Sequence, residues 1–160
     1  MQELAIKKFP DPFLRRKASK ILKVTSYERD ILAEMAKLMY LSQGVGLAAT
    51  QVGINKQLIV IDVGNGLTSL INPVIVKKDG KEVLEEGCLS VPGINVKIRR
   101  SKTVTVHFLD EDGNAKQLHA DGLLARAIQH ELDHLAGTLI IDYVNPVKKI
   151  LLRRALTKRK

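Results

Sequence analysis

The spacing of apolar residues in the first third of the chain predicts a helix. Thr25-Ser26-Tyr27-Glu28 has the pattern of a capping box, in which the threonine and glutamate side chains satisfy free backbone N–H groups at a helix start. After it, four apolar residues recur at helical spacing: Ile31, Met35, Leu38 and Met39. We therefore predict a helix of about four turns that ends near Gln43-Gly44.

From Lys56 onward the apolar residues form short runs that are typical of strands. The predicted strands are residues 58–61, 67–71, 74–76, 83–84, 96–98 and 104–108. Asp79-Gly80 and Asp112-Gly113 stand between such runs and are candidate hairpin turns. Strands this short and this closely spaced favour antiparallel sheet.

A second amphipathic helix is predicted between Asp121, a good N-terminal cap, and Gly137, a good C-terminal breaker. One stripe of this helix is apolar: Leu124, Ile128, Leu132 and Leu135. A roughly opposite stripe contains Leu123, Ala127, His130 and His134. One face is therefore expected to pack in the core while the other faces a site. Asn145-Pro146 has the pattern of the cap and first residue of a terminal helix.

These elements predict an α+β fold in which antiparallel sheets pack around a central helix, with an N-terminal helix and a C-terminal helix. The 160 residues are the length of one domain and are enough to bury a core. We therefore expect residues 1–160 to form a single domain, with a basic C-terminal helix or tail from about residue 146.

The composition indicates the cellular compartment of this domain and the state of its cysteine. The N-terminus lacks an apolar signal core, and nowhere do 18 apolar residues run together, so we expect a cytoplasmic protein without a membrane segment. Cys88 is the only cysteine, so no internal disulfide can form and the thiol is free for metal binding or nucleophilic chemistry.

The candidate chemistry lies in His130-Glu131-Leu132-Asp133-His134 on the second predicted helix. Residues four apart share a helix face, so both imidazoles can bind one divalent ion while Glu131 handles the proton of a water bound to that ion. This interpretation requires a third ligand. The residues after His134 include no histidine, glutamate or cysteine, and only Asp142 offers a carboxylate. The upstream candidates are Cys88, His107, His119 and several carboxylates.

Three separated motifs resemble those of the peptide deformylases. They are Gly44-Val45-Gly46-Leu47-Ala48-Ala49-Thr50-Gln51, Glu86-Gly87-Cys88-Leu89-Ser90 and His130-Glu131-Leu132-Asp133-His134, in the family's order. Phe9-Pro10-Asp11-Pro12-Phe13-Leu14-Arg15 is similar to the family's N-terminal signature, so the resemblance spans nearly the whole chain. It implies a single deformylase-like catalytic domain, which hydrolyses the N-terminal formyl group from formylmethionine of nascent polypeptides and releases formate.

The resemblance also implies a role for each motif. Cys88, His130 and His134 are expected to bind the metal. Glu131 is expected to act as general base and then to protonate the leaving amine. The side-chain amide of Gln51 and the backbone N–H of Leu89 are expected to stabilise the oxyanion. Asp133 flanks the ligand face and is expected to be a structural partner without a role in bond breaking.

The expected substrate contacts come from the same motifs. An extended peptide would pair with backbone near Val45-Gly46 and Gly87, while an apolar pocket accepts the methionine side chain. Arg126 and Ala127 lie one helical turn before His130, where family members more often have apolar residues. We expect Arg126 to lie along this pocket with its charged head in solvent.

The ligand set does not select one ion, because two nitrogens and one sulfur suit iron(II), zinc, nickel or cobalt alike. The resemblance points to Fe²⁺, with Ni²⁺ or Co²⁺ as more durable replacements and Zn²⁺ as a weaker one.

The net charge of +9 is concentrated at the C-terminus. Residues 147–160 carry seven basic residues and no acidic one, so removing these charges from +9 leaves +2 for the rest of the chain. Such a tail is either a solvated helix end or a docking segment for RNA phosphates. The resemblance favours docking to the ribosome, where nascent chains emerge. The chain has no base-reading motif, so we expect no DNA partner.

Three other functions compete with this interpretation. A zinc endopeptidase shares the His-Glu-x-x-His helix but needs a downstream ligand, and Ile140 stands where the long form of that motif has histidine. A cysteine hydrolase would use Cys88 as nucleophile. A binding protein would use only the basic tail.

Overall fold

The computed structural model describes residues 3–158 and confirms the α+β class. The 3₁₀ helices are η1 (Pro12–Arg15), η2 (Ala49–Val52) and η3 (Ile140–Tyr143). The α-helices are α1 (Ser26–Leu41), α2 (Gly122–Leu135) and α3 (Pro146–Thr157). The strands are β1 (Gly46–Ala48), β2 (Leu58–Ile61), β3 (Thr68–Asp79), β4 (Glu82–Cys88), β5 (Val91–Arg100), β6 (Thr103–Leu109) and β7 (Ala115–Asp121).

Helix α1 begins at the predicted capping box. The Thr25 hydroxyl accepts a hydrogen bond from Tyr27 N, and the Glu28 carboxylate accepts one from Thr25 N at 2.9 Å. Glu28 also accepts a hydrogen bond from Lys56 Nζ at 2.5 Å, which ties the start of α1 to the chain that enters β2. The predicted N-terminal helix is confirmed.

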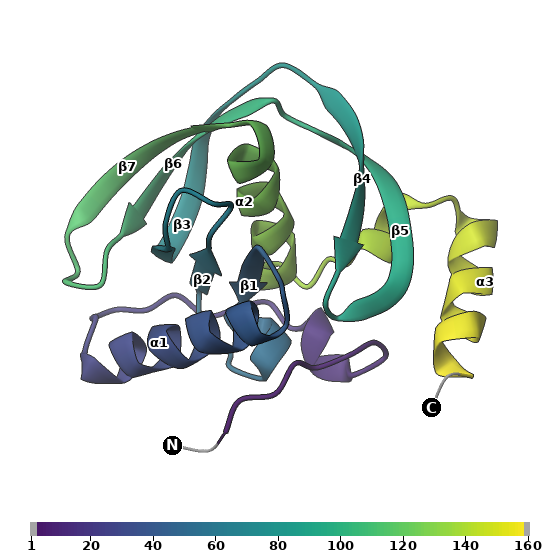
Figure 1. Ribbon diagram of the computed structural model, residues 1–160, viewed down its shortest axis with the longest axis horizontal. Helices are drawn as coiled ribbons and strands as arrows, with labels where there is room; N and C mark the ends of the chain where they lie inside the picture. The colour runs from purple at the N-terminus through teal and green to yellow at the C-terminus, as the bar shows by residue number, and fades with distance from the viewer. Residues whose placement is uncertain (1–2, 159–160) are drawn as a thin grey trace.

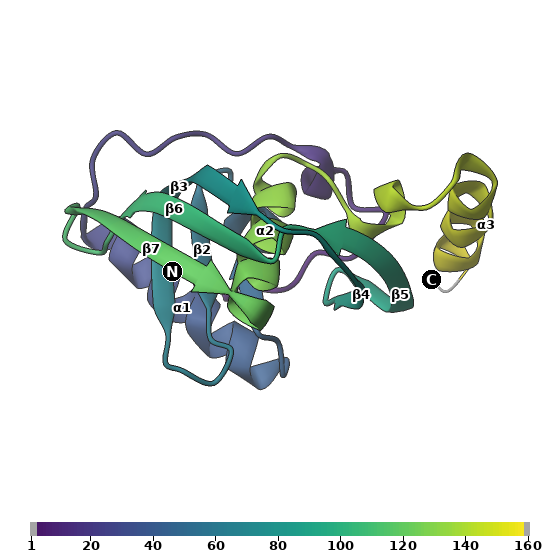
Figure 2. The same cartoon turned by 90° about the horizontal axis from the view of Figure 1, so that it is seen from above.

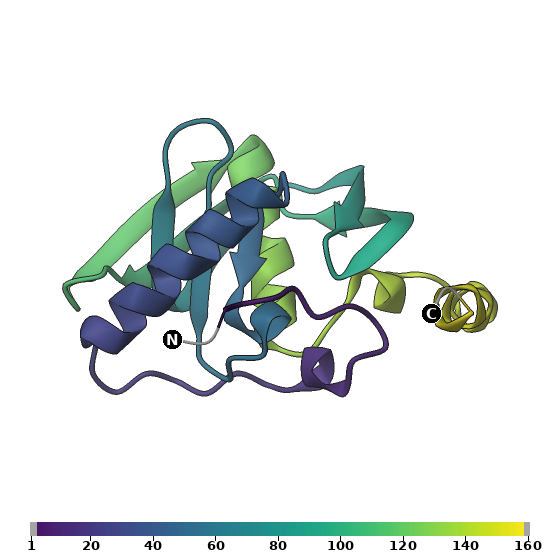
Figure 3. The same cartoon turned by 60° about the horizontal axis from the view of Figure 1, so that its bottom comes forward.

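Five antiparallel strands form the main sheet, in the order β1-β2-β3-β6-β7. Helix α1 crosses one face of this sheet and α2 covers the other (Figure 3). Strand β2 lies between the two helices: Ile59 and Ile61 pack on the α2 side, and Leu58 and Val60 on the α1 side. This double cover explains why β2 is a continuous apolar run.

Strand β3 joins two of the predicted strands into one. Its first residues pair with β2 and its later residues with β6, with a register irregularity between Ile71 and Val74. Asn72 lies at this irregularity with φ of 51°, and its side chain bonds both Ile21 N and Ile21 O. Residues 72 and 73, which separate the two predicted strands in the sequence, therefore form a bulge within one strand.

Only one of the two predicted hairpin turns is confirmed. Asp112-Gly113 joins the paired strands β6 and β7, as predicted. The hairpin prediction at Asp79-Gly80 is wrong, because β3 pairs with β6 while β4 turns away to form a separate two-stranded sheet with β5. Figures 1 and 2 show β4 and β5 standing between α2 and α3.

Helices α2 and α3 begin near the predicted caps. Asp121 occupies the N-cap position of α2, although its side chain accepts no capping hydrogen bond within the described chain. The Asn145 side chain accepts one from Lys148 N at 2.8 Å at the start of α3. Helix α3 lies at the edge of the molecule (Figure 2). Its buried residue Leu156 belongs to an apolar cluster with Val91, Val96 and Ile98 of β5. Within residues 3–158, no helix is both long enough and apolar enough to cross a membrane.

Candidate metal centre and active site

Cys88 ends strand β4, and the two histidines of the motif lie one helical turn apart on α2. Cys88 Sγ is 3.2 Å from His134 Nε2, which is 3.2 Å from His130 Nε2. One ligand atom from each of the three residues lies within 4.8 Å of the others. A sulfur and two imidazole nitrogens at this spacing fit a divalent first-row metal ion.

The orientation of His130 is fixed by Glu86. His130 Nδ1 lies 2.9 Å from Glu86 Oε1, so Nε2 is the nitrogen that faces the other two ligands. This is the usual arrangement of a metal-binding histidine, whose other ring nitrogen bonds a carboxylate. Burial lowers the pKa of His130, but the hydrogen bonds to Cys88 and Glu86 outweigh burial and raise it to about 10. A metal ion therefore competes with a proton for this ring.

His134 is more deeply buried than His130 and is neutral. Burial lowers its pKa well below the ordinary value, and the charge of His130 acts in the same direction. Its backbone carbonyl accepts a hydrogen bond from the Thr50 hydroxyl at 3.1 Å, which ties α2 to η2. A neutral imidazole is the form that binds a metal.

Glu131 lies beside the three ligand residues with one oxygen unpaired. The residue is 4% exposed, and its Oε2 has no hydrogen-bond partner within residues 3–158. Burial raises the pKa of this carboxyl to about 7. A buried carboxyl that titrates near neutrality is suited to take up and return a proton.

Gly44 and Gly46 allow the motif of residues 44–51 to lie close to Glu131 and Leu89. A Cβ on Gly46 would lie 2.6 Å from Glu131 Oε1, and one on Gly44 would lie 2.7 Å from Leu89 Cδ1. Any larger residue would displace the carboxylate or the leucine. The two glycines therefore leave the space that the Glu131 and Leu89 side chains occupy at the site.

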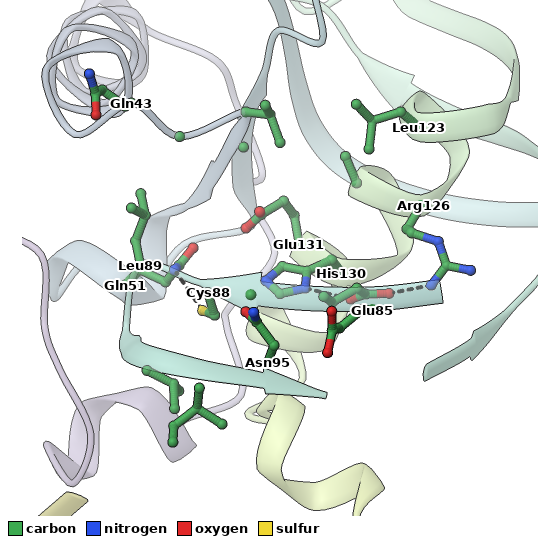
Figure 4. Close-up of a pocket in the computed structure, with 18 of the residues that line it drawn as sticks. Gln43, Gln51, Glu85, Cys88, Leu89, Asn95, Leu123, Arg126, His130 and Glu131 are labelled. Carbon is green, nitrogen blue, oxygen red and sulfur yellow. Dashed lines mark hydrogen bonds and ion pairs between the residues drawn. The ribbon is translucent and has the colours of Figure 1, made fainter. Parts of the chain in front are cut away.

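Gln51 is held in place by three neighbours. Its Oε1 accepts a hydrogen bond from Ala48 N at 2.9 Å, and its Nε2 donates to Ser90 Oγ at 3.1 Å. The same Nε2 lies 3.8 Å from Cys88 Sγ (Figure 4). The amide is thus oriented with its donor toward the thiol. Leu89 follows Cys88 and lines the cavity that opens beside the ligand residues.

A cavity of about 430 Å³ opens beside Cys88, His130 and Glu131 (Figure 4). Other residues that line it are Val45, Gly46, Gln51, Gly87, Leu89, Leu123, Arg126 and Ala127. The structure thus brings all the predicted substrate contacts to one pocket. His107 and His119, by contrast, bond Gln117 and Thr105 on the surface of β6 and β7.

The chain matches the family described as Polypeptide deformylase over residues 3–150. It is 50% identical to the peptide deformylase of Caldanaerobacter subterraneus over 139 residues, which cover 87% of each chain. It is 46% identical to the peptide deformylase of Xylella fastidiosa over 166 aligned positions, which cover all of this chain and 98% of that one. The crystal structure of the Ehrlichia chaffeensis peptide deformylase in complex with actinonin superposes with a TM-score of 0.95 at 36% identity, covering 100% and 99% of the two chains.

The chain belongs to the peptide deformylase family. Its activity is accordingly the metal-dependent removal of the formyl group from N-formylmethionyl peptides. The endopeptidase alternative is not favoured. Asp142, the one downstream carboxylate considered as a ligand, instead bonds Arg15 and Lys149.

One expectation about this deformylase is wrong: the head of Arg126 does not lie in solvent. Arg126 is 6% exposed, and its Nη1 donates to Glu86 Oε2 at 2.6 Å and to Ile98 O at 3.0 Å. Its Nη2 donates to Glu82 O at 2.9 Å. A carboxylate and two backbone carbonyls hold the buried guanidinium against β4 and β5, and Arg126 also lines the cavity.

Sequence reasoning gave no role to Glu86 or Arg100, which support the deformylase site. Arg100 binds both oxygens of Glu86 at 2.8 and 2.9 Å. Burial alone raises the pKa of Glu86, but hydrogen bonds from Arg100 and His130 lower it to about 2. Asp133, expected to be a structural partner, accepts hydrogen bonds from Arg100 and Tyr143. Metal-binding histidines often bond a carboxylate, but nothing in the sequence links Glu86 to His130, 44 residues away.

Proposed function

We propose that this deformylase hydrolyses formyl peptides with Cys88, His130 and His134 as metal ligands and Glu131 as the proton-transfer group. The observation that carries the proposal is the meeting of one sulfur and two ring nitrogens beside a buried carboxylate with a free oxygen. A divalent cation held there would supply Lewis-acid activation of water and of the formyl carbonyl.

Glu131 moves one proton through the reaction. It takes the proton from the water that attacks the formyl carbon and gives it to the amine as the carbon–nitrogen bond breaks. The products are formate and the free N-terminus of the peptide. The pKa of about 7 supports this role, because the carboxylate can accept and release a proton near neutral pH.

Gln51 and Leu89 stabilise the oxyanion that forms during attack. The Gln51 amide is oriented by Ala48 and Ser90, so its donor needs little reorganisation when negative charge develops. The backbone N–H of Leu89 follows the ligand residue Cys88 and lines the same cavity.

The extended formyl peptide pairs with backbone at Val45, Gly46 and Gly87. Ala127 and the stem of Arg126 form part of the wall that accepts the methionine side chain. Backbone pairing reads little sequence, so many nascent chains qualify as substrates.

The cellular ion is Fe²⁺ in this proposal, with Ni²⁺ or Co²⁺ as durable replacements and Zn²⁺ less active. A thiolate with two imidazoles is compatible with all four. Metal analysis after anaerobic purification tests this choice.

The basic C-terminal helix docks to the ribosome, and the enzyme works in the cytoplasm as one catalytic domain. Exposed basic residues on α3 and directly after it support this docking: Lys148, Arg153, Arg154 and Lys158. Arg159 and Lys160 belong to the same basic tail but lie outside the described residues. Neutralising the four described residues is expected to weaken cosedimentation with ribosomes, most strongly at low salt.

The decisive experiment incubates nickel-loaded protein with a formyl-Met-Ala-Ser peptide and measures formate beside a Glu131→Ala control. We expect formate from the wild type alone, with loss of activity in a strong chelator and recovery on adding the ion. Cleavage inside an unformylated protein would support the endopeptidase instead. Formate from neither protein would overturn the proposal.

A further inference from the structure

The metal ligands come from two elements that belong to different layers of the molecule. Cys88 is on β4 of the small sheet, whereas His130 and His134 are on α2, which packs against the large sheet. The distance between the thiol and the imidazoles therefore depends on how the small sheet is held against α2.

Arg126 makes the most extensive side-chain connection between α2 and the small sheet. From one turn before His130 it reaches Glu86 and the backbone carbonyl of Glu82 on β4, and the carbonyl of Ile98 on β5. All three acceptors lie between 2.6 and 3.0 Å from its guanidinium nitrogens. A planar guanidinium with several donors can bridge three acceptors at once, which an ammonium group cannot do in the same geometry.

Arg100 does not duplicate this connection. It lies on β5 and binds Glu86 on the paired strand β4, so this ion pair closes the small sheet on itself. Its contact with α2 is a different ion pair, with Asp133, which lies between the two ligand histidines in the sequence. Arg126 crosses from α2 to Glu86, the carboxylate that also orients His130.

We propose that Arg126 is a positioning residue that sets the spacing between Cys88 and the two histidines, and through it the affinity for the metal ion. Glu86 lies two residues before Cys88 on β4, so holding Glu86 against α2 also holds the thiol. The guanidinium is buried and bound to the Glu86 carboxylate, so in this inference it holds the protein together and does not bind a charged group of the substrate. The inference rests on the proposed metal site and adds a residue that controls it.

The test distinguishes the contribution of the Arg126 guanidinium to metal binding from that of its aliphatic chain. Arg126→Met keeps an unbranched apolar chain along the pocket and removes the guanidinium, while Arg126→Lys keeps the charge but loses the bridge. The matched control is Arg15→Met, because Arg15 binds Asp142 and the carbonyl of Gly137 without touching Glu86 or the ligand residues.

Each protein is titrated with Co²⁺ against a competing chelator, the cobalt–thiolate absorption band is recorded, and thermal unfolding is followed without metal. We expect Arg126→Met to raise the Co²⁺ dissociation constant by about 10- to 100-fold and to alter the band, with Arg126→Lys intermediate. Arg15→Met should lower the unfolding temperature while leaving the Co²⁺ affinity at the wild-type value.

Unchanged Co²⁺ affinity and an unchanged band in Arg126→Met would overturn the inference, even if the unfolding temperature fell. Should Arg126→Met fail to fold, wild-type affinity in Arg126→Lys would overturn it in the same way. Wild-type protein that bound no Co²⁺ and released no formate would overturn the proposed function as well, so the two failures are distinguishable.

Discussion

Two buried glutamates hold together two regions of this molecule, and they differ in the kind of partners that they bind. Glu28, at the start of α1, accepts hydrogen bonds from Thr25, three residues before it, and from Lys56. Glu86, on β4, binds Arg100, Arg126 and His130, which lie 14, 40 and 44 residues further on. The same chemistry thus fixes the start of a helix in one place and supports an active site in the other.

The partners of the two glutamates also differ in their access to water. The Lys56 side chain is 33% exposed, whereas those of Arg100 and Arg126 are 5% and 8% exposed. If its glutamate is lost, Lys56 can turn toward solvent, but the two arginines cannot. Because an unpaired buried charge costs far more than an exposed one, the Glu86 region should be much more sensitive to substitution.

Substitution of Glu86 has the largest expected effect. Glu86→Gln keeps the size of the side chain and removes the charge that balances two buried guanidinium groups. We expect a loss of about 3–5 kcal/mol in the free energy of unfolding, measured by urea titration in chelator so that metal binding does not contribute. A loss smaller than that of Glu28→Gln would contradict the comparison.

Glu28→Gln should have a smaller effect. It weakens charge-assisted hydrogen bonds to Lys56 and Thr25, and we expect a loss of about 1.5–3 kcal/mol in the same titration. The Co²⁺ affinity of the folded protein should stay at the wild-type value, because Glu28 is remote from the ligand residues in the fold. A weakened metal site in this variant would show that the two regions are coupled.

Thr25→Ala sharpens the comparison by removing the capping hydroxyl, which also donates a hydrogen bond to Glu28. The Thr25 hydroxyl accepts a hydrogen bond from Tyr27 N, and losing a cap of this kind costs about 1 kcal/mol. Thr25→Ser is the control, since serine can make the same hydrogen bond. Equal losses in the two variants would exclude capping as the cause.

The last expected effect is a change in acid sensitivity. Burial raises the pKa of Glu28, but hydrogen bonds from Lys56 and Thr25 lower it from 4.5 to about 2. A folded pKa below the ordinary value means that Glu28 stabilises the protein fully above pH 4.5 and loses this contribution as the pH falls toward 2. The stability difference between wild type and Glu28→Gln should therefore shrink over this range, as urea titrations at several pH values would show. A constant difference would refute this account.

The contrast between partners that are close together in the sequence and partners that are far apart also explains which contacts the sequence could predict. Thr25 and Glu28 are three residues apart and His130 and His134 four, so helical geometry alone brings each pair together. Cys88 was chosen among several possible third ligands only through the family resemblance. No periodicity relates residue 88 to residues 130 and 134.

The errors have one physical origin, which is pairing between distant segments. Asp79-Gly80 has the chemistry of a turn, but local chemistry does not decide which strand β3 pairs with, and Asp79 is opposite Thr103. An arginine on a predicted pocket face is expected to extend to water, and only the fold shows that Glu86 and two carbonyls lie within its reach. Long-range polar contacts of this kind leave no pattern in a single sequence.

The close approach of Gly46 to Glu131 limits how the cavity can be re-engineered. The space that a methyl group would need at position 46 is already taken by a carboxylate oxygen 2.6 Å away. Variant libraries aimed at new side-chain preferences should therefore keep this position fixed and diversify Leu123 and Ala127, which line the same cavity from α2. At position 46, broader selectivity would disturb the carboxylate proposed to transfer the proton, whereas changes along the helix wall leave it in place.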